Sequence, residues 1–196
     1  MTVIHATDPT TKVLSLLYQQ REDMKTLITE RNSSSDVQRA IRADDIMMML
    51  GHGNEYGLFS KPDKNGIYRR FLITDRHVQF LREKTCIGIW CYANKFAEKY
   101  GLHGLFSGMI ISELQEAVDL GVPATKDEID REMEKFTIRL KDCMETYGLK
   151  QTPMRMKELD DVQSALTKFN YCNLYISHHR FQFLCRRDAH EPRHER

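Results

Sequence analysis

The chain of 196 residues has no apolar run that approaches the roughly 20 residues a membrane-spanning helix needs. It also has almost no net charge, because its 29 lysines and arginines nearly balance its 28 aspartates and glutamates, which gives a formal charge of +1. Such a balance provides no general attraction to nucleic acid or to an anionic membrane. Neither is therefore expected as a partner. Residues 1–11 contain no long apolar stretch and do not resemble a signal peptide.

Cysteine is scarce, and the sequence holds no Cys-x-x-Cys pair. The five cysteines are Cys86, Cys91, Cys143, Cys172 and Cys185. Their irregular spacing argues against a disulfide framework and a zinc ribbon, and the histidines lack partners at metal-ligand spacing. We therefore expect no metal and no cofactor. Unpaired cysteines without a secretion signal are typical of a reducing compartment, which makes the cytoplasm the expected location.

What the chain does have is the composition of an ordinary folded domain, with 41% hydrophobic and 29% charged residues. Over its first two thirds, short apolar runs alternate with amphipathic segments. The two strongest runs, at 46–50 and 86–90, are apolar without alternation, as in parallel strands that are covered on both faces. This pattern predicts an α/β fold with a mostly parallel sheet and helices on both faces.

Weaker signals place the remaining elements of this part. Further strands are predicted at 2–6, 25–29 and 105–111, and a hairpin with arms at 57–60 and 67–74. Asp8 is expected to cap a helix with Pro9 at its first position, and Gly101 to end the helix that follows residue 91. Ser112 and Gln115 form a capping-box pattern for a helix after the strand at 105–111.

The last third of the chain is helical in pattern. Thr125 begins a long amphipathic run that ends at Gly148, and Thr152 begins a further helix that is expected to continue through Phe169. Residues 172–176 can extend that helix or form a closing strand. We divide the chain into an α/β core, 1–123, and a helical extension, 124–196, packed on the same domain.

A histidine and a cysteine directly follow the two strongest strands. His52 stands two residues beyond the run at 46–50, and Cys91 is the first residue after the run at 86–90. Sites in open parallel sheets form at the carboxyl ends of strands, and neighbouring strands lie about 4.8 Å apart. If these two strands are neighbours, the imidazole and the thiol emerge together at one edge of the sheet.

This pair is suited to nucleophilic catalysis. Cys91 would attack a carbonyl carbon as a thiolate and form an acyl-enzyme, while His52 transfers the proton. The amides of Gly53 and Cys91 are candidates for the oxyanion hole. A helix that begins after Cys91 is expected to lower the pKa of the thiol, so that Cys91 reacts fastest with an electrophile. Cys86 and Cys143 are expected in the core.

The residues around the pair resemble the caspase-like cysteine peptidase superfamily (clan CD), which includes caspases, metacaspases, legumains, gingipains, clostripain and separase. The segment 45–54, DIMMMLGHGN, is similar to their apolar strand with His-Gly, and 86–93, CIGIWCYA, to the strand that carries their cysteine. The hairpin after His52 resembles the small β-structure of caspases. The resemblance covers about 44–113 and implies a caspase-like fold, a peptide or protein substrate, His52 as the proton-transferring residue, and Cys91 as nucleophile.

The motif also departs from the family. Trp90 precedes Cys91 where caspases have Ala, and Tyr92 follows it where they have Arg. Tyr92 is therefore a candidate for restricting the site or contacting substrate. Glu55 and Glu113 lie near the predicted edge and are candidates for binding a basic substrate residue. No specificity pocket carries over from the family, so the cleavage preference stays open.

Three functions follow from these observations. The first is a cysteine endopeptidase that works through a thioester acyl-enzyme. The second is a catalytically inactive caspase-like binding or scaffold protein, which the Tyr92 departure and the unmatched C-terminal helices motivate. The third is a thiol hydrolase or transferase that acts on a non-peptide ester. The C-terminal helices also leave a homodimer open. A dinucleotide loop is not indicated, because Tyr56 stands where its third glycine belongs.

Overall fold

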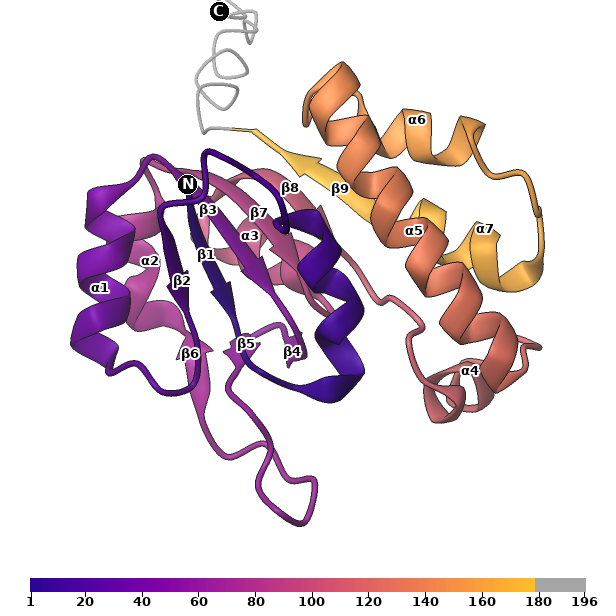
Figure 1. The fold of residues 1–196 in the computed structure, drawn as a ribbon, viewed down its shortest axis with the longest axis horizontal. Coiled ribbons are helices and arrows are strands. Elements are labelled where there is room, and N and C mark those ends of the chain that lie inside the picture. The colour runs from indigo at the N-terminus through magenta and orange to yellow at the C-terminus, as the bar shows by residue number, and fades with distance from the viewer. Residues whose placement is uncertain (179–196) are drawn as a thin grey trace, which may run out of the picture.

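The computed structural model describes residues 1–178, and Cys185 lies outside this part of the chain. Its centre is a six-stranded sheet in the order β2-β1-β3-β7-β8-β9 (Figure 1). The strands are β1 (Thr2–His5), β2 (Thr26–Ile28), β3 (Ile46–Leu50), β7 (Thr85–Ile89), β8 (His103–Ser107) and β9 (Leu174–Ser177). The first five strands pair in parallel, and β9 runs antiparallel to β8. The predicted α/β fold with a mostly parallel sheet is confirmed.

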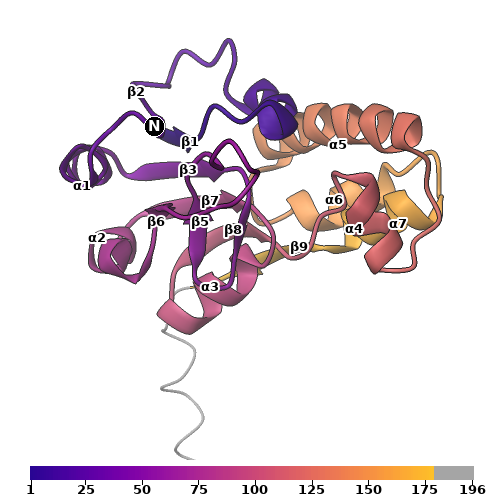
Figure 2. The same ribbon diagram turned by 90° about the horizontal axis from the view of Figure 1, so that it is seen from below.

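Helices cover both faces of this sheet. One face carries η1 (Pro9–Leu17), α5 (Lys126–Tyr147), α6 (Thr152–Glu158) and α7 (Ala165–Cys172), and the other carries α1 (Ser34–Ala43), α2 (Val78–Leu81) and α3 (Ala93–Tyr100). Figure 2 shows α5 above the sheet and α2 and α3 below it. Within β3, Met48 and Leu50 face the first layer, and Met47 and Met49 face the second. This double cover explains why β3 and β7 read as unbroken apolar runs.

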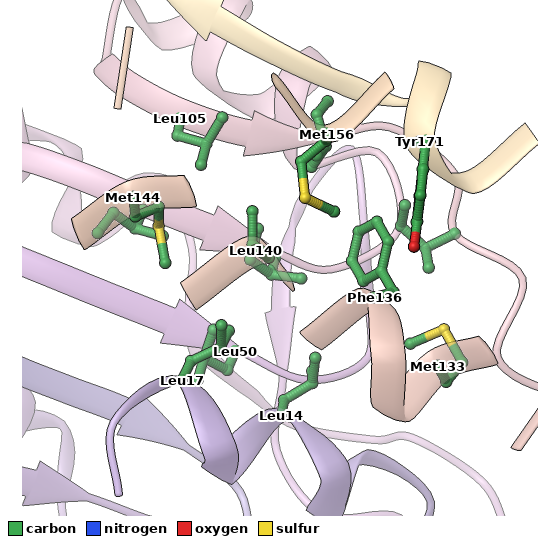
Figure 3. Close-up of a cluster of buried hydrophobic side chains, with 14 of the residues drawn as sticks. Leu14, Leu17, Leu50, Leu105, Met133, Phe136, Leu140, Met144, Met156 and Tyr171 are labelled. Atoms are coloured by element: carbon green, nitrogen blue, oxygen red, sulfur yellow. The ribbon is translucent and has the colours of Figure 1, made fainter. Parts of the chain in front are cut away.

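The larger hydrophobic core joins η1, the sheet and α5 (Figure 3). Leu14 and Leu17 of η1 meet Leu50 of the sheet, and Phe136 and Leu140 approach from α5. All five side chains are buried. Truncation of such a residue, for example Phe136→Ala, costs about 3–5 kcal/mol of unfolding free energy. This core therefore holds η1 and α5 firmly against the same face of the sheet.

The C-terminal segment differs in part from the prediction. Thr125 caps α5 and Gly148 ends it, as expected. The helix expected from Thr152 is wrong as one element, because α6 ends at Glu158 and α7 begins only at Ala165. Asp160 accepts the amides of residues 162 and 163, and Ser164 caps α7, so local hydrogen bonds replace the helical ladder between them. For residues 172–176, of the two predicted alternatives, a longer helix or a closing strand, the structure has the strand. This strand, β9, pairs with β8 at the edge of the central sheet.

The segment after β8 also departs from expectation. The predicted strand 105–111 is misplaced, because β8 begins at His103 and ends at Ser107. The side-chain oxygen of Asn170 on α7 accepts the amide of Ile111 at 2.8 Å, so a helix residue rather than a strand binds this backbone. The next helix, α4 (Leu114–Asp119), is capped by the carboxylate of Glu116, which accepts the amides of residues 112 and 113. The predicted cap by Ser112 and Gln115 is wrong.

A small antiparallel sheet follows β3, as the hairpin pattern predicted. It consists of β4 (Gly53–Asn54), β5 (Gly57–Phe59) and β6 (Phe71–Ile73), and η2 (Asp75–His77) comes next. The connection between β5 and β6 projects away from the body of the molecule (Figure 1). Among residues 1–178, no helix combines the length and apolarity that a bilayer span requires.

Candidate active site

The strands that lead to His52 and Cys91 are neighbours in the sheet. β3 and β7 pair in parallel with Leu50 opposite Ile89, and the Gly51 amide donates to the Ile89 carbonyl at 3.1 Å. Both chains therefore leave the sheet side by side at its carboxyl edge, where sites in parallel sheets form. The prediction that these two strands are neighbours is confirmed.

His52 and Cys91 line one small cavity of about 30 Å³. This volume admits a water molecule but no substrate. Three apolar side chains from η1 and α5 help to line it, namely Val13, Leu14 and Met133. A groove of about 840 Å³ begins beside the cavity and shares Thr10, Val13, Ser112 and Met133 with it. The two candidate catalytic groups thus lie next to a groove of ligand-binding size, and the four shared residues stand between the two spaces.

A sharp turn presents Cys91 at the end of β7. The next residue, Tyr92, has φ 67°, a left-handed conformation that non-glycine residues seldom adopt. The Tyr92 amide donates to the Gly108 carbonyl at 3.1 Å, and the Ser107 hydroxyl donates to the Trp90 carbonyl at 2.7 Å. Residues at the end of β8 therefore hold the turn in place. Backbone strain of this kind clusters at functional sites.

The Cys91 thiol is protonated in this arrangement. Its Sγ donates to the Ile110 carbonyl at 3.8 Å. Burial first, and the negative charge of Glu116 second, raise the pKa of Cys91 to about 12. The expected lowering by the helix that follows is therefore wrong, because desolvation of a thiolate outweighs one helix terminus. In this closed form, the exposed Cys172 rather than Cys91 should react first with an electrophile.

His52 lies between a hydroxyl and two carboxylates. Its Nε2 is 2.7 Å from Thr10 Oγ1, and it is 3.8 Å from Glu113 Oε1 and 4.0 Å from Asp8 Oδ2. The Tyr68 ring lies against the imidazole with 5.4 Å between the ring centroids. Both carboxylates are placed to stabilise the positive charge that the imidazole gains when it accepts a proton.

Asp8 is a buried carboxylate with several hydrogen-bond donors. Thr10 donates its amide and its hydroxyl to Oδ1 at 3.0 and 2.9 Å, and the Tyr68 hydroxyl donates to Oδ2 at 3.0 Å. Burial by itself would raise the pKa of Asp8, but these hydrogen bonds outweigh it and hold the pKa below its ordinary value. Asp8 is therefore ionised at neutral pH.

Gly53, the residue after His52, leaves room for no side chain. An added Cβ would lie 2.2 Å from Cδ1 of Trp90 and 2.5 Å from the Gly57 carbonyl oxygen. The Trp90 indole N–H in turn donates to the Asn54 carbonyl at 3.1 Å. Because Trp90 immediately precedes the cysteine, this contact ties the two halves of the candidate site together.

The register of β4 and β5 determines where the Gly53 amide points. The Phe59 amide donates to the His52 carbonyl at 2.8 Å, which makes these residues a hydrogen-bonded pair. The next pair, Gly53 with Leu58, is therefore a non-hydrogen-bonded pair of the antiparallel ladder. The Gly53 amide accordingly faces away from β5, and its role as an oxyanion donor stays a prediction.

The three predicted substrate contacts fare differently. Glu113 lines the groove and approaches His52, so the structure brings it to the site. Neither Glu55 nor Tyr92 lines the cavity or the groove. The Tyr92 ring instead lies within 5.1 Å of the Lys95 ammonium on α3. Tyr92 therefore does not plug the cavity, and contacts of Glu55 and Tyr92 with substrate stay predictions.

Sequence reasoning missed Thr10 and Tyr68, and it assigned Asp8 only as a helix cap. The rule that paired His52 with Cys91 also applies to β1, which is the other neighbour of β3 in the sheet. Residues just after β1 could have been proposed for the site on that ground. No sequence signal points to Tyr68, because a projecting loop carries it back to the edge of the sheet.

No protein-family model matches this sequence, and no curated protein matches it either. The chemistry of the site is therefore argued from its geometry. Within residues 1–178, no group of three or more histidine, cysteine, aspartate or glutamate side chains is arranged to hold a metal ion.

Proposed function

We propose that the protein is a caspase-like cysteine endopeptidase with His52 and Cys91 as its catalytic dyad. The proposal rests on one observation: the His52 imidazole and the Cys91 thiol follow two neighbouring parallel strands and line the same cavity. The small sheet β4-β5-β6 directly after His52 adds to the resemblance on which the proposal draws.

The proposed reaction uses the dyad in two halves. His52 accepts the Cys91 proton as the sulfur bonds to the carbonyl carbon, and the amides of Gly53 and Cys91 stabilise the oxyanion. The C–N bond then breaks, and His52 gives its proton to the leaving amine. Water next attacks the thioester and gives a proton to His52, which returns it to the sulfur as the new carboxylic acid leaves. Each half conserves protons, and the enzyme ends as it began.

The structure corresponds to a closed form in this proposal. A peptide cannot enter the 30 Å³ cavity, whereas the adjoining groove of 840 Å³ can hold one. Separation of Met133 on α5 from Val13 and Leu14 on η1 would join the two spaces. Opening would also remove the burial that raises the pKa of Cys91, and the thiol would become reactive.

Cleavage of a peptide library tests the proposal. The purified protein would be incubated with proteome-derived peptides, and new termini and covalent adducts on Cys91 would be identified by mass spectrometry. New termini that are absent with His52→Ala, together with an acyl mass on Cys91, support the peptidase. New termini that persist in His52→Ala would contradict the dyad mechanism.

The closed cavity also supports a second function, a catalytically inactive caspase-like binding or scaffold protein. A site that stays closed needs no nucleophile and would retain only its binding surfaces. A small ester probe and a peptidyl electrophile would be applied to the folded protein. Absence of any adduct on Cys91 with both probes, also in a Met133→Ala variant, favours the scaffold. Reaction with the ester alone favours a hydrolase or transferase that acts on non-peptide esters.

A cytoplasmic location is part of the proposal. The described cysteines Cys86, Cys91, Cys143 and Cys172 are all free thiols. Free thiols are typical of a reducing compartment, which supports this location. Fractionation of the producing cell would test it.

A further inference from the structure

The geometry points to a positioning relay behind the dyad, in which Asp8 acts through the Thr10 hydroxyl to hold His52 as its Nε2–H tautomer. This inference rests on the proposed peptidase function, since a fixed tautomer matters only if His52 transfers protons. It adds two residues to the proposed mechanism. Neither is a catalytic residue, because both act through the imidazole.

Proton accounting assigns the direction of each hydrogen bond. Thr10 Oγ1 lies 2.9 Å from Asp8 Oδ1 and 2.7 Å from His52 Nε2, and a hydroxyl carries only one proton. Ionised Asp8 can only accept, so the hydroxyl proton belongs to that contact. The second contact then requires His52 Nε2 to donate. Nδ1 is left unprotonated, as the nitrogen that can accept the Cys91 proton.

The relay is anchored from behind. The Thr10 amide and the Tyr68 hydroxyl both donate to Asp8, so the carboxylate is fixed before it acts on Thr10. Pro9 at the first position of η1 restricts the backbone between the two relay residues. The Asp8 side chain is 6% exposed and that of His52 is 15% exposed, whereas Thr10 itself is exposed. The anchor on Asp8 is therefore buried, and the hydrogen bond between Thr10 and His52 lies at the surface.

The relay has a chemical consequence for the reaction. When His52 accepts the thiol proton, the positive ring lies 4.0 Å from Oδ2 of the buried Asp8 and 3.8 Å from Oε1 of the exposed Glu113. Asp8 stabilises this ion pair without taking a proton itself. The Thr10 hydroxyl keeps the ring from rotating, so that Nδ1 returns the proton to the leaving amine.

The chain offers a matched control outside the site. The Thr167 hydroxyl donates to Oδ2 of the buried Asp160 at 2.8 Å, as the Thr10 hydroxyl donates to Asp8. Thr167→Val removes a threonine hydroxyl from an aspartate that lines neither the cavity nor the groove. Thr10→Val removes the hydroxyl from His52 at constant shape, and Thr10→Ser keeps it. Asp8→Asn removes the charge and preserves the helix cap, since both residues are good N-caps.

The first arm of the test needs no activity. Protein labelled with ¹⁵N-histidine would be examined by NMR in mildly alkaline solution, with the His52 ring signals assigned through His52→Gln. A protected Nε2–H proton on His52 is expected in the wild type, Thr10→Ser and Thr167→Val, and its loss to solvent exchange is expected in Thr10→Val. An Nδ1–H tautomer in the wild type would overturn the relay, even if no variant folds. So would an unchanged Nε2–H signal in folded Thr10→Val.

The second arm measures cleavage of a peptide that the wild type accepts. Thr10→Val and Asp8→Asn should each lower kcat by roughly 10- to 100-fold with KM little changed, as expected for a lost hydrogen bond to a charged group. Thr10→Ser should recover most of the rate, and Thr167→Val should retain it. Equal losses in Thr10→Val and Thr167→Val would refute the relay. An inactive wild type with the expected tautomer would instead refute the peptidase and leave the geometry of the relay established.

Discussion

The amino edge of the central sheet holds Asp44 and Cys86, and its carboxyl edge holds Asp8 and Cys91. Both aspartates are buried, with side chains 6% exposed. Burial raises the pKa of both thiols to about 12. At the amino edge, Asp44 accepts the Thr2 hydroxyl at 2.6 Å and faces the N-terminal ammonium at 3.5 Å. The two edges therefore use the same residue types, although Cys86 is fully buried and Cys91 is half-buried.

What differs is the surroundings of each pair. Cys86 Sγ lies within hydrogen-bond distance of the Leu81 and Lys84 carbonyls, at 3.8 and 3.7 Å, and is part of the hydrophobic core. Cys91 shares its cavity with an imidazole and lies beside a groove. Residue type and a raised pKa therefore do not distinguish the two cysteines. An imidazole that lines the same cavity and an adjoining groove distinguish the carboxyl edge.

Removal of each cysteine should give the largest contrast between the edges. Cys91→Ala is expected to lower peptide cleavage by at least roughly 1,000-fold, because Cys91 is the nucleophile of the proposed reaction. Cys86→Ala should keep the rate and cost about 1–2 kcal/mol of unfolding free energy. Turnover assays and urea denaturation measure both effects. Comparable activity of the two variants would remove the distinction between the edges.

The carboxyl edge also holds a structural histidine, which predicts a pH-dependent stability. Burial lowers the pKa of His5 from 6.5 to about 4, while the hydrogen bond of Thr11 and the charge of Asp8 act in the opposite direction. Between these pH values the unfolded chain binds a proton that the folded chain does not. The unfolding free energy should therefore fall by about 3 kcal/mol as the pH drops from 6.5 to 4. Denaturation at several pH values would measure the slope, and His5→Gln should flatten it.

The two aspartates should separate stability from activity. Asp44→Asn replaces the carboxylate opposite the N-terminal ammonium and should cost about 2 kcal/mol of unfolding free energy. Asp8→Asn keeps its helix cap and should cost less than about 1 kcal/mol. Urea denaturation of both variants at neutral pH measures the difference. A larger loss in Asp8→Asn would reverse the assignment of the structural and the functional aspartate.

The smallest expected effect concerns the cover over the cavity. Met133→Ala removes a side chain that lines both the cavity and the groove, so alkylation of Cys91 by iodoacetamide should accelerate about 10-fold. Cys86 should stay protected in the same sample. Met144→Ala on the same helix lies in the core outside the cavity and serves as the control. Equal acceleration in both variants would indicate loosening of the whole fold rather than opening of the site.

Much of this fold could be predicted because its signals are local. Doubly covered strands leave apolar runs at 46–50 and 86–90, and a capping threonine and a terminal glycine mark the ends of α5. The failures have a common cause. The stretch 108–112 and the break between α6 and α7 depend on hydrogen bonds from side chains such as Asn170 and Asp160, which no local periodicity encodes.

The sequence alone determined that His52 and Cys91 directly follow two buried strands, because a strand covered on both faces is recognised from its consecutive apolar residues. Only the tertiary structure decided the partners of these two residues. The Thr10 and Asp8 side chains reach His52 across 42 and 44 positions of sequence, and Met133 reaches the cavity from α5. The tertiary structure also decided the protonation of the Cys91 thiol, because the pKa of Cys91 depends on how much water the packed chain excludes from it.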